Sequence, residues 1–390
     1  MRIIHVIGAF DKKLGGTYSA ILSIIRMENA LGYQSEVLSL VSNGQEYDEE
    51  LKGRVHLFPP SFPYVFSNSI KASEWLSDNI GNYNLIVIHE VWGATAIKAA
   101  HLAYKMGVPY VIWPHGSLDP FDLQKKKALK KIVGNVLISN ITRNAKAICC
   151  TSELEGRLLQ TYNRLNDNIH LLPLPINYTC KGSRAAFRHK FNISDKDFVL
   201  LFVARIDYKK GLDILLKALH QFIDKAGAVN CKLLIAGKGN TKYETYIRSL
   251  IEDLALEKHV TISGFLAGDD KANAYAGADC FVLPSMNENY GISVIEALQS
   301  DLPVLISDNV YIWKDIMPQA GWVCKHDVDS VHAYIKNVYK AFQTGEISLK
   351  TPGKAGSSFN QQNLMPEYAN FYGKILYQQV QTVLHSQLTV

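Results

Sequence analysis

The sequence predicts an α/β protein of two doubly wound, Rossmann-like domains, each with a parallel sheet covered by helices. Short apolar segments typical of buried strands alternate with longer segments of helical periodicity along most of the 390 residues. This alternation indicates parallel strands, because a parallel connection needs a crossover, usually a helix. It is interrupted around residues 171–190, where Pro173 and Pro175 precede a basic helical segment. A chain of this length also favours two domains over one.

In the first half, short predicted strands alternate with predicted helices. The strands are Arg2–Ile7, Ser35–Leu40, Leu85–His89, Pro109–Trp113 and Ala147–Thr151. The pattern predicts helices over Tyr18–Leu31, over Ala94–Met106 and from Glu153 onward. A last helix over Met365–Val383 carries aromatic residues at near-helical spacing and is expected to cross back onto this half.

The same alternation restarts in the second half. The predicted strands are Phe198–Val203, Lys232–Ala236, Val260–Gly264, Cys280–Leu283 and Pro303–Ser307, and the predicted helices include Leu212–Ala226, Tyr243–Leu256 and Asp270–Ala276. The polar, Gly- and Ser-rich stretch Lys350–Gln362 is expected to be a loop. We therefore expect one domain over residues 1–175 with 366–390 and another over 176–365.

The composition is that of an ordinary globular protein, with 47% hydrophobic and 20% charged residues and a net charge of +5. No stretch approaches the ~18 apolar residues of a membrane span, and the N-terminus lacks a secretion signal, so we expect a cytoplasmic protein. The six cysteines show no zinc-type spacing and are expected to be reduced thiols.

The one basic concentration is the run Lys125–Lys131. Such a run is commonly a solvated helix face. Its interleaved apolar residues also permit an amphipathic helix that contacts the inner face of a membrane. A nucleic-acid partner is not expected, because a longer basic stripe would be needed.

Two glutamates, Glu288 and Glu296, bracket the turn and helix start that follow the strand Cys280–Leu283. Glu288 is expected in the strand-to-helix loop, where backbone N–H groups attract anions. By helical geometry, Glu296 lies ~80° around the helix from Glu288, so both can flank one cleft. Carboxylates there accept hydrogen bonds from sugar hydroxyls, while the amides of Asn289, Tyr290, Gly291 and Ile292 hold phosphate. These are the parts needed to bind a nucleotide-sugar; a solvated helix start is the alternative.

Three further segments follow predicted strands of the second half. Arg205 and Lys210 flank Ile206–Lys209 ahead of Gly211, a position that favours anion binding over ordinary surface charges. Gly237-Lys238-Gly239 and Gly264-Phe265-Leu266 end two other strands.

In these four motifs, in this order, the chain resembles the retaining glycosyltransferases of family 4, which have the two-domain GT-B fold. The resemblance implies that Arg205 and Lys210 clamp the donor diphosphate. It also implies that Phe265 and Leu266 line the base pocket, that Glu296 holds the ribose and that Glu288 holds the transferred sugar. The chain departs from the family at Lys238, where Gly-Asp-Gly is common.

The first domain matches more loosely. Gly15, Gly16 and Thr17 follow the first predicted strand, where glycines allow close approach to a ligand; a tight turn is the alternative. His115 ends the strand Pro109–Trp113, and the resemblance implies a contact of this histidine with the donor sugar. His89, at another strand end, is a further candidate.

The resemblance implies a hexosyltransferase with retained anomeric configuration, in which the departing phosphate oxygen takes the acceptor proton. UDP-glucose is the preferred donor on family frequency, with GDP-mannose as runner-up, and a glycan or lipid-linked glycan is the expected acceptor. A sugar-nucleotide 2-epimerase of the same fold and a silent glycan-binding protein are the alternatives.

No metal and no other cofactor are expected. The two Asp-x-Asp sequences, at Asp195–Asp197 and Asp327–Asp329, are interpreted as a turn and a helix cap. Arg205 and Lys210 can supply the positive charge that a metal would otherwise provide.

Overall fold

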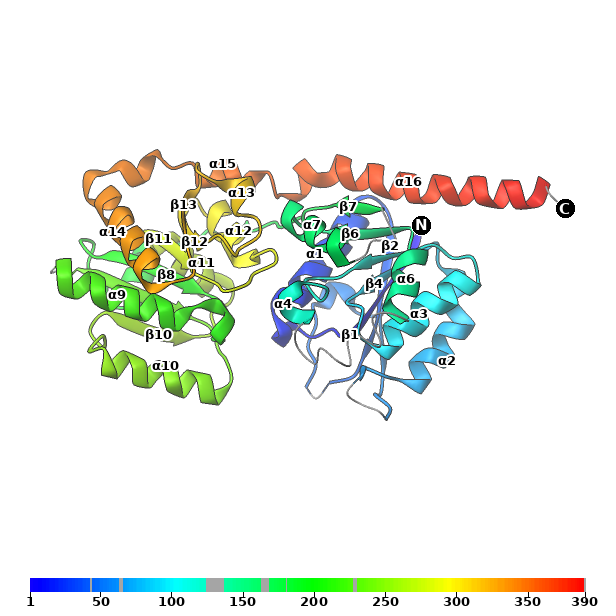
Figure 1. Cartoon of the computed structure of the whole chain (residues 1–390), viewed down its shortest axis with the longest axis horizontal. Helices are drawn as coiled ribbons and strands as arrows, with labels where there is room; N and C mark the ends of the chain where they lie inside the picture. Colours follow the sequence, from blue (N-terminus) through cyan, green and yellow to red (C-terminus); the bar gives the residue numbers. More distant parts are fainter. Residues whose placement is uncertain are drawn as a thin grey trace. The chain divides into compact units, whose positions relative to one another are not determined.

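The computed structural model describes residues 1–42, 44–62, 66–123, 137–162, 168–179, 181–226 and 230–388. The chain divides into two compact units (Figure 1). Unit 1 comprises Met1–Pro175 and Gln361–Val390, and unit 2 comprises Ile176–Asn360. The chain thus crosses to unit 2 after Pro175 and returns at Gln361.

Unit 1 contains a seven-stranded parallel sheet in the order β3-β2-β1-β4-β5-β6-β7. The strands are β1 (Arg2–Ala9), β2 (Gln34–Leu40), β3 (Val55–Phe58), β4 (Leu85–His89), β5 (Tyr110–Trp113), β6 (Ala147–Cys150) and β7 (Ile169–Leu171). The sequence did not predict β3 and β7, the two edge strands, because they are short and lack a buried apolar run. The order reverses between β1 and β4, which is the doubly wound arrangement expected.

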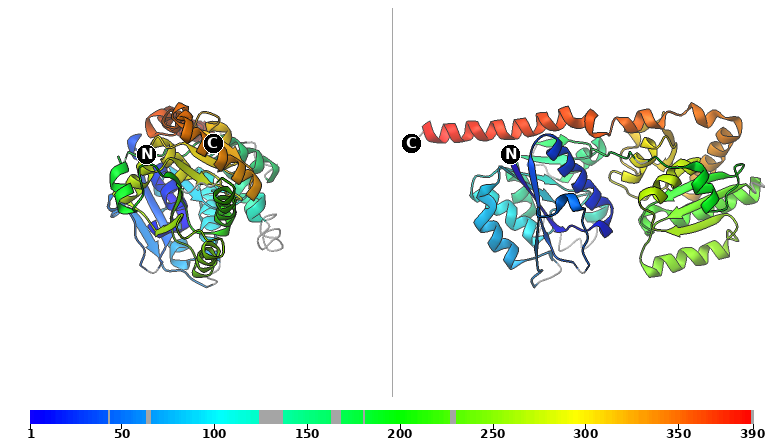
Figure 2. Two further views of the ribbon diagram at one scale, coloured as in Figure 1. Left: turned by 90° about the vertical axis from the view of Figure 1, so that its left-hand side faces the viewer. Right: turned by 180° about the vertical axis from the view of Figure 1, so that it is seen from behind.

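Helices cover both faces of this sheet (Figures 1 and 2). They are α1 (Gly16–Ala30), α2 (Ile70–Asn79), α3 (Ala94–Lys105), α4 (Pro120–Leu123), α6 (Ser139–Asn144), α7 (Glu153–Tyr162) and α16 (Gln361–Leu388). Successive side chains of β1 point to opposite faces. Ile4 and Val6 join the apolar core under α2 and α3, whereas Ile7 joins the core under α1.

The returning helix α16 packs beside α1 in unit 1 (Figure 2). Tyr368, Phe371 and Tyr372 of α16 are buried, and the Tyr372 hydroxyl donates to the Glu28 carboxylate of α1. The Tyr368 hydroxyl donates to the carbonyl of Pro173 at 3.1 Å. The predicted crossing of the last helix back onto the first half is therefore confirmed by these contacts.

Unit 2 contains a six-stranded parallel sheet in the order β10-β9-β8-β11-β12-β13. The strands are β8 (Phe198–Val203), β9 (Cys231–Ala236), β10 (Val260–Gly264), β11 (Cys280–Leu283), β12 (Val304–Ser307) and β13 (Gly321–Cys324). The helices are α8 (Arg184–Lys190), α9 (Leu212–Ala226), α10 (Thr241–Asp253), α11 (Gly268–Gly277), α12 (Ile292–Gln299), α13 (Trp313–Ile316), α14 (Val328–Thr344) and α15 (Pro352–Ser357). The order reverses between β8 and β11.

The prediction of a loop over Lys350–Gln362 is wrong, because this stretch contains α15. Its glycines serve close packing rather than a turn. An added Cβ at Gly356 would lie 2.8 Å from the backbone of Gln299, and one at Gly353 would lie 2.0 Å from the Asp301 carboxylate. Small residues let α15 pack against α12 and the segment that follows it.

The basic segment after the interruption forms α8, which is anchored by a buried ion pair. The Arg188 guanidinium lies 3.0 Å from the Asp279 carboxylate, and both side chains are less than a tenth exposed. Arg188 also donates to the carbonyl of Asp197 at 3.2 Å. The basic residue thus fastens α8 to the sheet of unit 2.

Five of the six cysteines are buried and free, as expected. These are Cys149, Cys150, Cys231, Cys280 and Cys324. Cys180 and the basic run Lys125–Lys131 lie outside the described residues. Within the described part of the chain, no helix is long and apolar enough to cross a membrane.

Candidate active site

In unit 2, the segments that follow β8 and β11 meet where the strand order reverses. β8 and β11 are parallel neighbours, so their carboxyl ends lie at the same edge of the sheet. Ligands of open parallel sheets bind at this edge, at the reversal point. Arg205 and Lys210 follow β8, and Glu288 follows β11. The fold therefore gathers these three predicted residues at one edge.

Lys210 closes the 3₁₀ turn Tyr208–Lys210, which Asp207 caps by accepting from the backbone N–H of Lys209 at 3.1 Å. Gly211 follows with a φ of +68°, and an added Cβ there would lie 2.2 Å from the carbonyl oxygen of Pro284. Only glycine allows this contact between the two loops.

The contact sets Lys210 against Glu288, and the two side chains form an ion pair. Both side chains are about a fifth exposed, at 18% and 19%. The lysine is therefore accessible from solution yet held in place by a carboxylate. A Lys–Glu pair at a strand-end edge offers one cation for phosphate and one acceptor for a hydroxyl.

Arg205 presents its guanidinium to solvent. Its side chain is 68% exposed, and its closest carboxylate contact is with Asp207 at 3.9 Å. A guanidinium so placed keeps most of its donors for an incoming anion, and its planar fork suits phosphate. Arg205 and Lys210 thus differ, one open and the other already paired.

Two glycines bring the loops after β8 and β9 together. An added Cβ at Gly237 or Gly239 would lie 1.9 Å from the carbonyl oxygen of Ala204 or Ile206, respectively. Between them lies Lys238, at the position where the resembling family commonly has an acid. Its backbone carbonyl accepts a hydrogen bond from the N–H of Ile206 at 3.0 Å, and its side chain is exposed. The two flanking glycines are therefore required by the backbone packing itself.

The helix α12 begins directly after the glutamate loop. Gly291 caps it with a φ of +73°, and the backbone of Glu288 is fixed by hydrogen bonds of 3.0 Å with Asn309 and Tyr311. Tyr290 buries its ring edge-on against Phe359, so its ring belongs to the core. The first N–H groups of a helix lack intrahelical partners and favour anions, which suits Ile292 and the residues before it.

Glu296 lies on α12, and two side chains of α11 hold its carboxylate. Lys271 approaches it at 2.7 Å, and the Tyr275 hydroxyl donates to it at 2.8 Å. Burial, followed by the neighbouring Glu296 charge, raises the pKa of Tyr275 well above its usual range, so the phenol stays a donor. A carboxylate has about four acceptor positions, so Glu296 retains capacity for further hydroxyls. No sequence motif had pointed to Lys271 or Tyr275.

Phe265 and Leu266 follow β10 and differ in exposure. The Phe265 side chain is 68% exposed, whereas Leu266 is 9% exposed. A large aromatic ring left open at the carboxyl end of a strand is available to stack on a base.

In unit 1, the segment after β1 leads through Gly15 into the first turn of α1. Gly15 has a φ of +70° and caps the helix, so glycine is favoured there by the backbone. Gly16 needs no positive φ, and an added Cβ at either glycine would meet no atom within 4 Å. The space beside Gly16 is open, so internal packing does not require the second glycine.

His115 follows β5 with a φ of +50°, a left-handed conformation that is uncommon outside glycine. Its Nε2 lies 2.8 Å from Nδ1 of His89, the other candidate histidine. The structure thus brings His89 and His115 together. His89 in turn contacts the buried His5, which sequence reasoning missed because it lies inside the apolar run of β1.

Glu155 is a second residue that sequence reasoning missed. Its buried carboxylate accepts the backbone N–H of Gly116 at 3.2 Å and that of Thr151 at 2.7 Å. It therefore fixes the turn that carries His115. The spacing Ser152-x-x-Glu155, with the Ser152 hydroxyl accepting from the Glu155 N–H, is a capping signal that could have identified it.

The two Asp-x-Asp sequences form local structure, as predicted. Asp197 accepts the backbone N–H of Ser194 at 2.9 Å within a turn, and Asp327 caps α14 by accepting that of Ser330 at 2.7 Å. Within the residues that the structure describes, no group of three or more His, Cys, Asp or Glu side chains could hold a metal ion.

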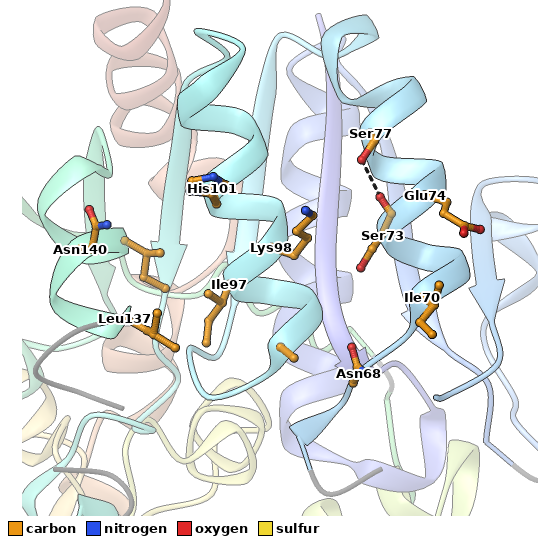
Figure 3. A pocket seen from close by; sticks show the side chains of 12 residues that line it. Asn68, Ile70, Ser73, Glu74, Ser77, Ile97, Lys98, His101, Leu137 and Asn140 are labelled. Carbon is orange, nitrogen blue, oxygen red and sulfur yellow. Dashed lines mark hydrogen bonds between the residues drawn. The ribbon is translucent and has the colours of Figure 1, made fainter. Parts of the chain in front are cut away.

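A separate hollow of about 610 Å³ lies among α2, α3 and the start of α6 (Figure 3). Ile97 and Leu137 line it, with Glu74 and Lys98 among its polar side chains. The hollow contains none of the candidate residues described above, so we assign it no part in the reaction.

Two family models match the chain over most of its length. The model for glycosyltransferase family 4 matches residues 14–179, and the model for glycosyl transferases group 1 matches residues 183–346. The chain belongs to glycosyltransferase family 4. It is a nucleotide-sugar-dependent glycosyltransferase of a retaining family, and its two parallel sheets form the GT-B fold.

Its relatives act on varied substrates. The chain is 25% identical over 325 residues to the uncharacterized glycosyltransferase MJ1607 of Methanocaldococcus jannaschii, covering 78% of each chain. It is 24% identical to mannosylfructose-phosphate synthase of Agrobacterium fabrum, covering 77% of this chain and 72% of that one. The alpha-monoglucosyldiacylglycerol synthase of Streptococcus pneumoniae is 23% identical over 59% of this chain and 53% of its own.

Solved structures share the fold of this glycosyltransferase at low identity. Sucrose-phosphate synthase from Thermosynechococcus elongatus has a TM-score of 0.79 at 17% identity, over 97% of this chain and all of its own. Anabaena HepE, solved in complex with UDP and glucose, has a TM-score of 0.75 at 17% identity, over 96% of this chain and all of its own.

Proposed function

We propose that this enzyme transfers glucose, or another hexose, from a UDP-sugar onto a glycan or lipid-linked glycan with retained configuration. The reaction would serve cell-envelope or exopolysaccharide synthesis. The observation that carries the proposal is the Lys210–Glu288 ion pair at the strand-order reversal of unit 2. Glu288 lies in the loop that leads directly into α12. This arrangement combines a cation, a hydroxyl acceptor and the backbone amides at a helix start, which are the groups that a sugar diphosphate needs.

In this proposal, unit 2 provides most of the contacts with the donor. Arg205, Lys210 and the amides of Asn289–Ile292 bind the diphosphate, with Gly239 beside them. Phe265 and Leu266 contact the base, Glu296 the ribose and Glu288 the transferred sugar. Gly15, Gly16 and Thr17 of unit 1 contribute a glycine loop open to ligand approach, and His115 contributes a nitrogen to the sugar.

The proposed chemistry requires no carboxylate nucleophile. As the sugar–oxygen bond breaks, negative charge grows on the leaving diphosphate, and Arg205 and Lys210 stabilise that charge where it develops. The departing phosphate oxygen takes the proton of the acceptor hydroxyl on the same face. Glu288, held by Lys210, then acts as a hydrogen-bond acceptor for the sugar.

The donor base and acceptor rest on relatives. HepE was solved with UDP and glucose, which supports a UDP-hexose. GDP-mannose is the second candidate donor, because one relative is a mannosylfructose-phosphate synthase. The alpha-monoglucosyldiacylglycerol synthase and WaaG, a glycosyltransferase involved in lipopolysaccharide biosynthesis, support a lipid-linked acceptor. In the proposal, the basic run Lys125–Lys131 contacts the inner face of the plasma membrane. The 2-epimerase alternative would need an acid–base set for elimination.

A nucleotide panel tests the donor. Because a ligand that binds only the folded state stabilises it by mass action, UDP should raise the melting temperature more than GDP or ADP at equal concentration. UDP-glucose incubated with the enzyme should then release UDP by transfer or slow hydrolysis. A larger shift with GDP would replace the proposed donor by GDP-mannose, and an epimerised nucleotide-sugar without transfer would favour the epimerase.

The two glutamates should differ in their effects on binding and turnover. If Glu296 holds the ribose, Glu296→Ala weakens the affinity for free UDP as well as for UDP-sugar. Glu288→Ala mainly lowers turnover, because free UDP lacks the sugar that Glu288 contacts. Calorimetry with UDP measures the first effect, and initial rates measure the second. An equal loss of UDP affinity in both variants would contradict the assignment.

A further inference from the structure

A continuous chain of buried side chains leads from His115 into the interior of unit 1. His115 Nε2 lies 2.8 Å from His89 Nδ1, and His89 Nε2 lies 2.8 Å from His5 Nδ1. His5 Nε2 lies 2.7 Å from the carboxylate of Glu28 on α1. His5, His89 and Glu28 are fully buried. We call these four residues the histidine relay.

The rings of the relay are aligned for hydrogen bonding. Neighbouring rings are tilted by 13° and 15° relative to each other, with centroids 5.1 Å apart in both pairs. The facing nitrogen atoms are 2.8 Å apart, so a centroid distance of 5.1 Å means that neighbouring rings lie edge to edge in nearly one plane. Each N–H therefore points at the lone pair of the next ring.

Glu28 fixes the direction of these hydrogen bonds. Besides His5, the Ser35 and Tyr372 hydroxyls donate to its two carboxylate oxygens. Burial, followed by the Glu28 charge, raises the pKa of Tyr372 well above its usual range, so the phenol keeps its proton. With hydroxyl donors on both of its oxygens, Glu28 serves as the acceptor of the hydrogen bond with His5.

The tautomer of each histidine follows from this end of the chain. His5 must donate from Nε2 to Glu28, so its Nδ1 accepts from His89 Nε2. His89 Nδ1 then accepts from His115 Nε2. In a neutral imidazole one nitrogen donates and the other accepts. Nδ1 of His115 is therefore left as a bare acceptor, and it has no hydrogen-bond partner within the described part of the chain.

Burial disfavours a charge at the outer two rings. It lowers the pKa of His115 to about 4, and burial together with repulsion from His115 and His5 lowers the pKa of His89 well below its usual range. His5 is the relay histidine that directly faces a carboxylate. A positive charge on His5 would therefore lie 2.7 Å from the carboxylate of Glu28.

Such a proton would travel through the hydrogen bonds. When His115 Nδ1 takes a proton, its Nε2 proton passes to His89 Nδ1 and the Nε2 proton of His89 passes to His5 Nδ1. The positive charge then rests on His5 against Glu28, and Nδ1–H of His115 has become a donor. One proton on the relay thus reverses the hydrogen-bonding role of His115.

Other titratable groups border the relay from each neighbouring element. Besides Tyr372 of α16, they are Cys149 of β6, Glu90 after β4 and Glu155 of α7. Burial raises the pKa of Cys149 and of Glu90, which favours their neutral forms. Glu155 binds the backbone of Gly116 and Thr151.

We propose that Glu28, His5 and His89 are positioning residues that fix the tautomer of His115. The Nδ1 of His115 then accepts a hydrogen bond at neutral pH and becomes a donor only when the relay gains a proton. That Nδ1 contacts a hydroxyl of the transferred sugar rests on the proposed function. The assignment of the tautomer does not. Through such a relay, the buried carboxylate of Glu28 determines which nitrogen of His115 carries the proton.

Nitrogen NMR of the full-length protein labelled with ¹⁵N-histidine tests the relay without any substrate. At pH 7.5 we expect the Nε2 atoms of His5, His89 and His115 to be protonated and the three Nδ1 atoms to be bare. On acidification, Nδ1 of His115 should gain a proton while imidazolium character appears at His5. Wild-type His115 with a protonated Nδ1, or with both tautomers mixed, at pH 7.5 would overturn the proposal.

Variants at His89 give an independent readout. The amide of His89→Gln can donate to His5 and accept from His115, so we expect the His115 tautomer and most of the turnover to be retained. His89→Phe keeps a ring but breaks the relay, so His115 should show mixed tautomers and turnover should fall about tenfold, with UDP affinity unchanged. His101→Phe, on the exposed face of α3, is the matched control.

Loss of turnover in His89→Phe with the His115 tautomer intact would show a structural role for His89 and contradict the relay. If UDP fails to bind the wild-type enzyme while the tautomers are as expected, the proposed function fails and the relay stands.

Discussion

Replacement of His115 by alanine is expected to lower turnover by roughly 10²–10⁴-fold, the range for positioned proton-transfer and donor groups, while UDP affinity stays near wild type. His115 belongs to unit 1, whereas the residues proposed to bind UDP belong to unit 2. A contact made only with the transferred sugar acts on the transition state more than on nucleotide binding. UDP calorimetry and initial rates on the same variant separate the two quantities.

The backbone at His115 calls for a matched set of variants. Its φ of +50° is strained for alanine, by about 1–2 kcal/mol, whereas asparagine tolerates it better. His115→Asn therefore removes the imidazole with less backbone strain, and His101→Ala controls for loss of a histidine on the surface of the same unit. A His115→Asn variant with full turnover, or with UDP affinity reduced as much as turnover, would make His115 a structural residue.

The strand-end motifs of unit 2 were accessible from the sequence because each lies in a short contiguous segment after an apolar strand. Gly237, Gly239 and Gly211 illustrate why such segments are recognisable. At each position an added Cβ would lie only 1.9–2.2 Å from a backbone carbonyl oxygen, so no residue with a side chain fits there. At these positions the backbone geometry therefore determines the residue type, so the motif can be recognised from a short stretch of sequence.

The relay was not accessible in the same way, because its members come from four separate elements. His5 and Glu28 lie within an apolar strand and helix and carry no local motif. Glu28 also contacts Tyr372, which lies 344 residues further along the chain. Only the tertiary packing of α1, β1, β4 and the segment after β5, together with α16, shows that these polar groups hydrogen-bond to one another.

The error at α15 has a related cause. Gly and Ser usually indicate a loop, but Pro352 at the first helical position and the small residues Gly353 and Gly356 fit a helix pressed against its neighbours. Sequence alone does not distinguish a glycine needed for a turn from one needed for close packing.

Loss of the Lys210 or Arg205 side chain is expected to slow transfer by about 10²-fold, on the order of 3 kcal/mol, because each cation stabilises charge that develops on the leaving diphosphate. The two residues should nevertheless differ in mechanism. Arg205 is open to solvent, so Arg205→Ala removes a cation and leaves no buried partner. Arg205→Lys keeps the charge but loses the planar fork, and we expect an intermediate rate.

Lys210→Ala also leaves Glu288 without its ion-pair partner. The two side chains act as a unit, so the effects of Lys210→Ala and Glu288→Ala on turnover should be less than additive in the double variant. Lys217→Ala on α9 and Arg248→Ala on α10, both exposed, control for the loss of a positive charge from unit 2. Rates are compared after melting temperatures confirm folding. Activity within twofold of wild type for both Arg205→Ala and Lys210→Ala would exclude a diphosphate clamp at this strand end, and strictly additive losses would show that Lys210 and Glu288 act on the donor independently.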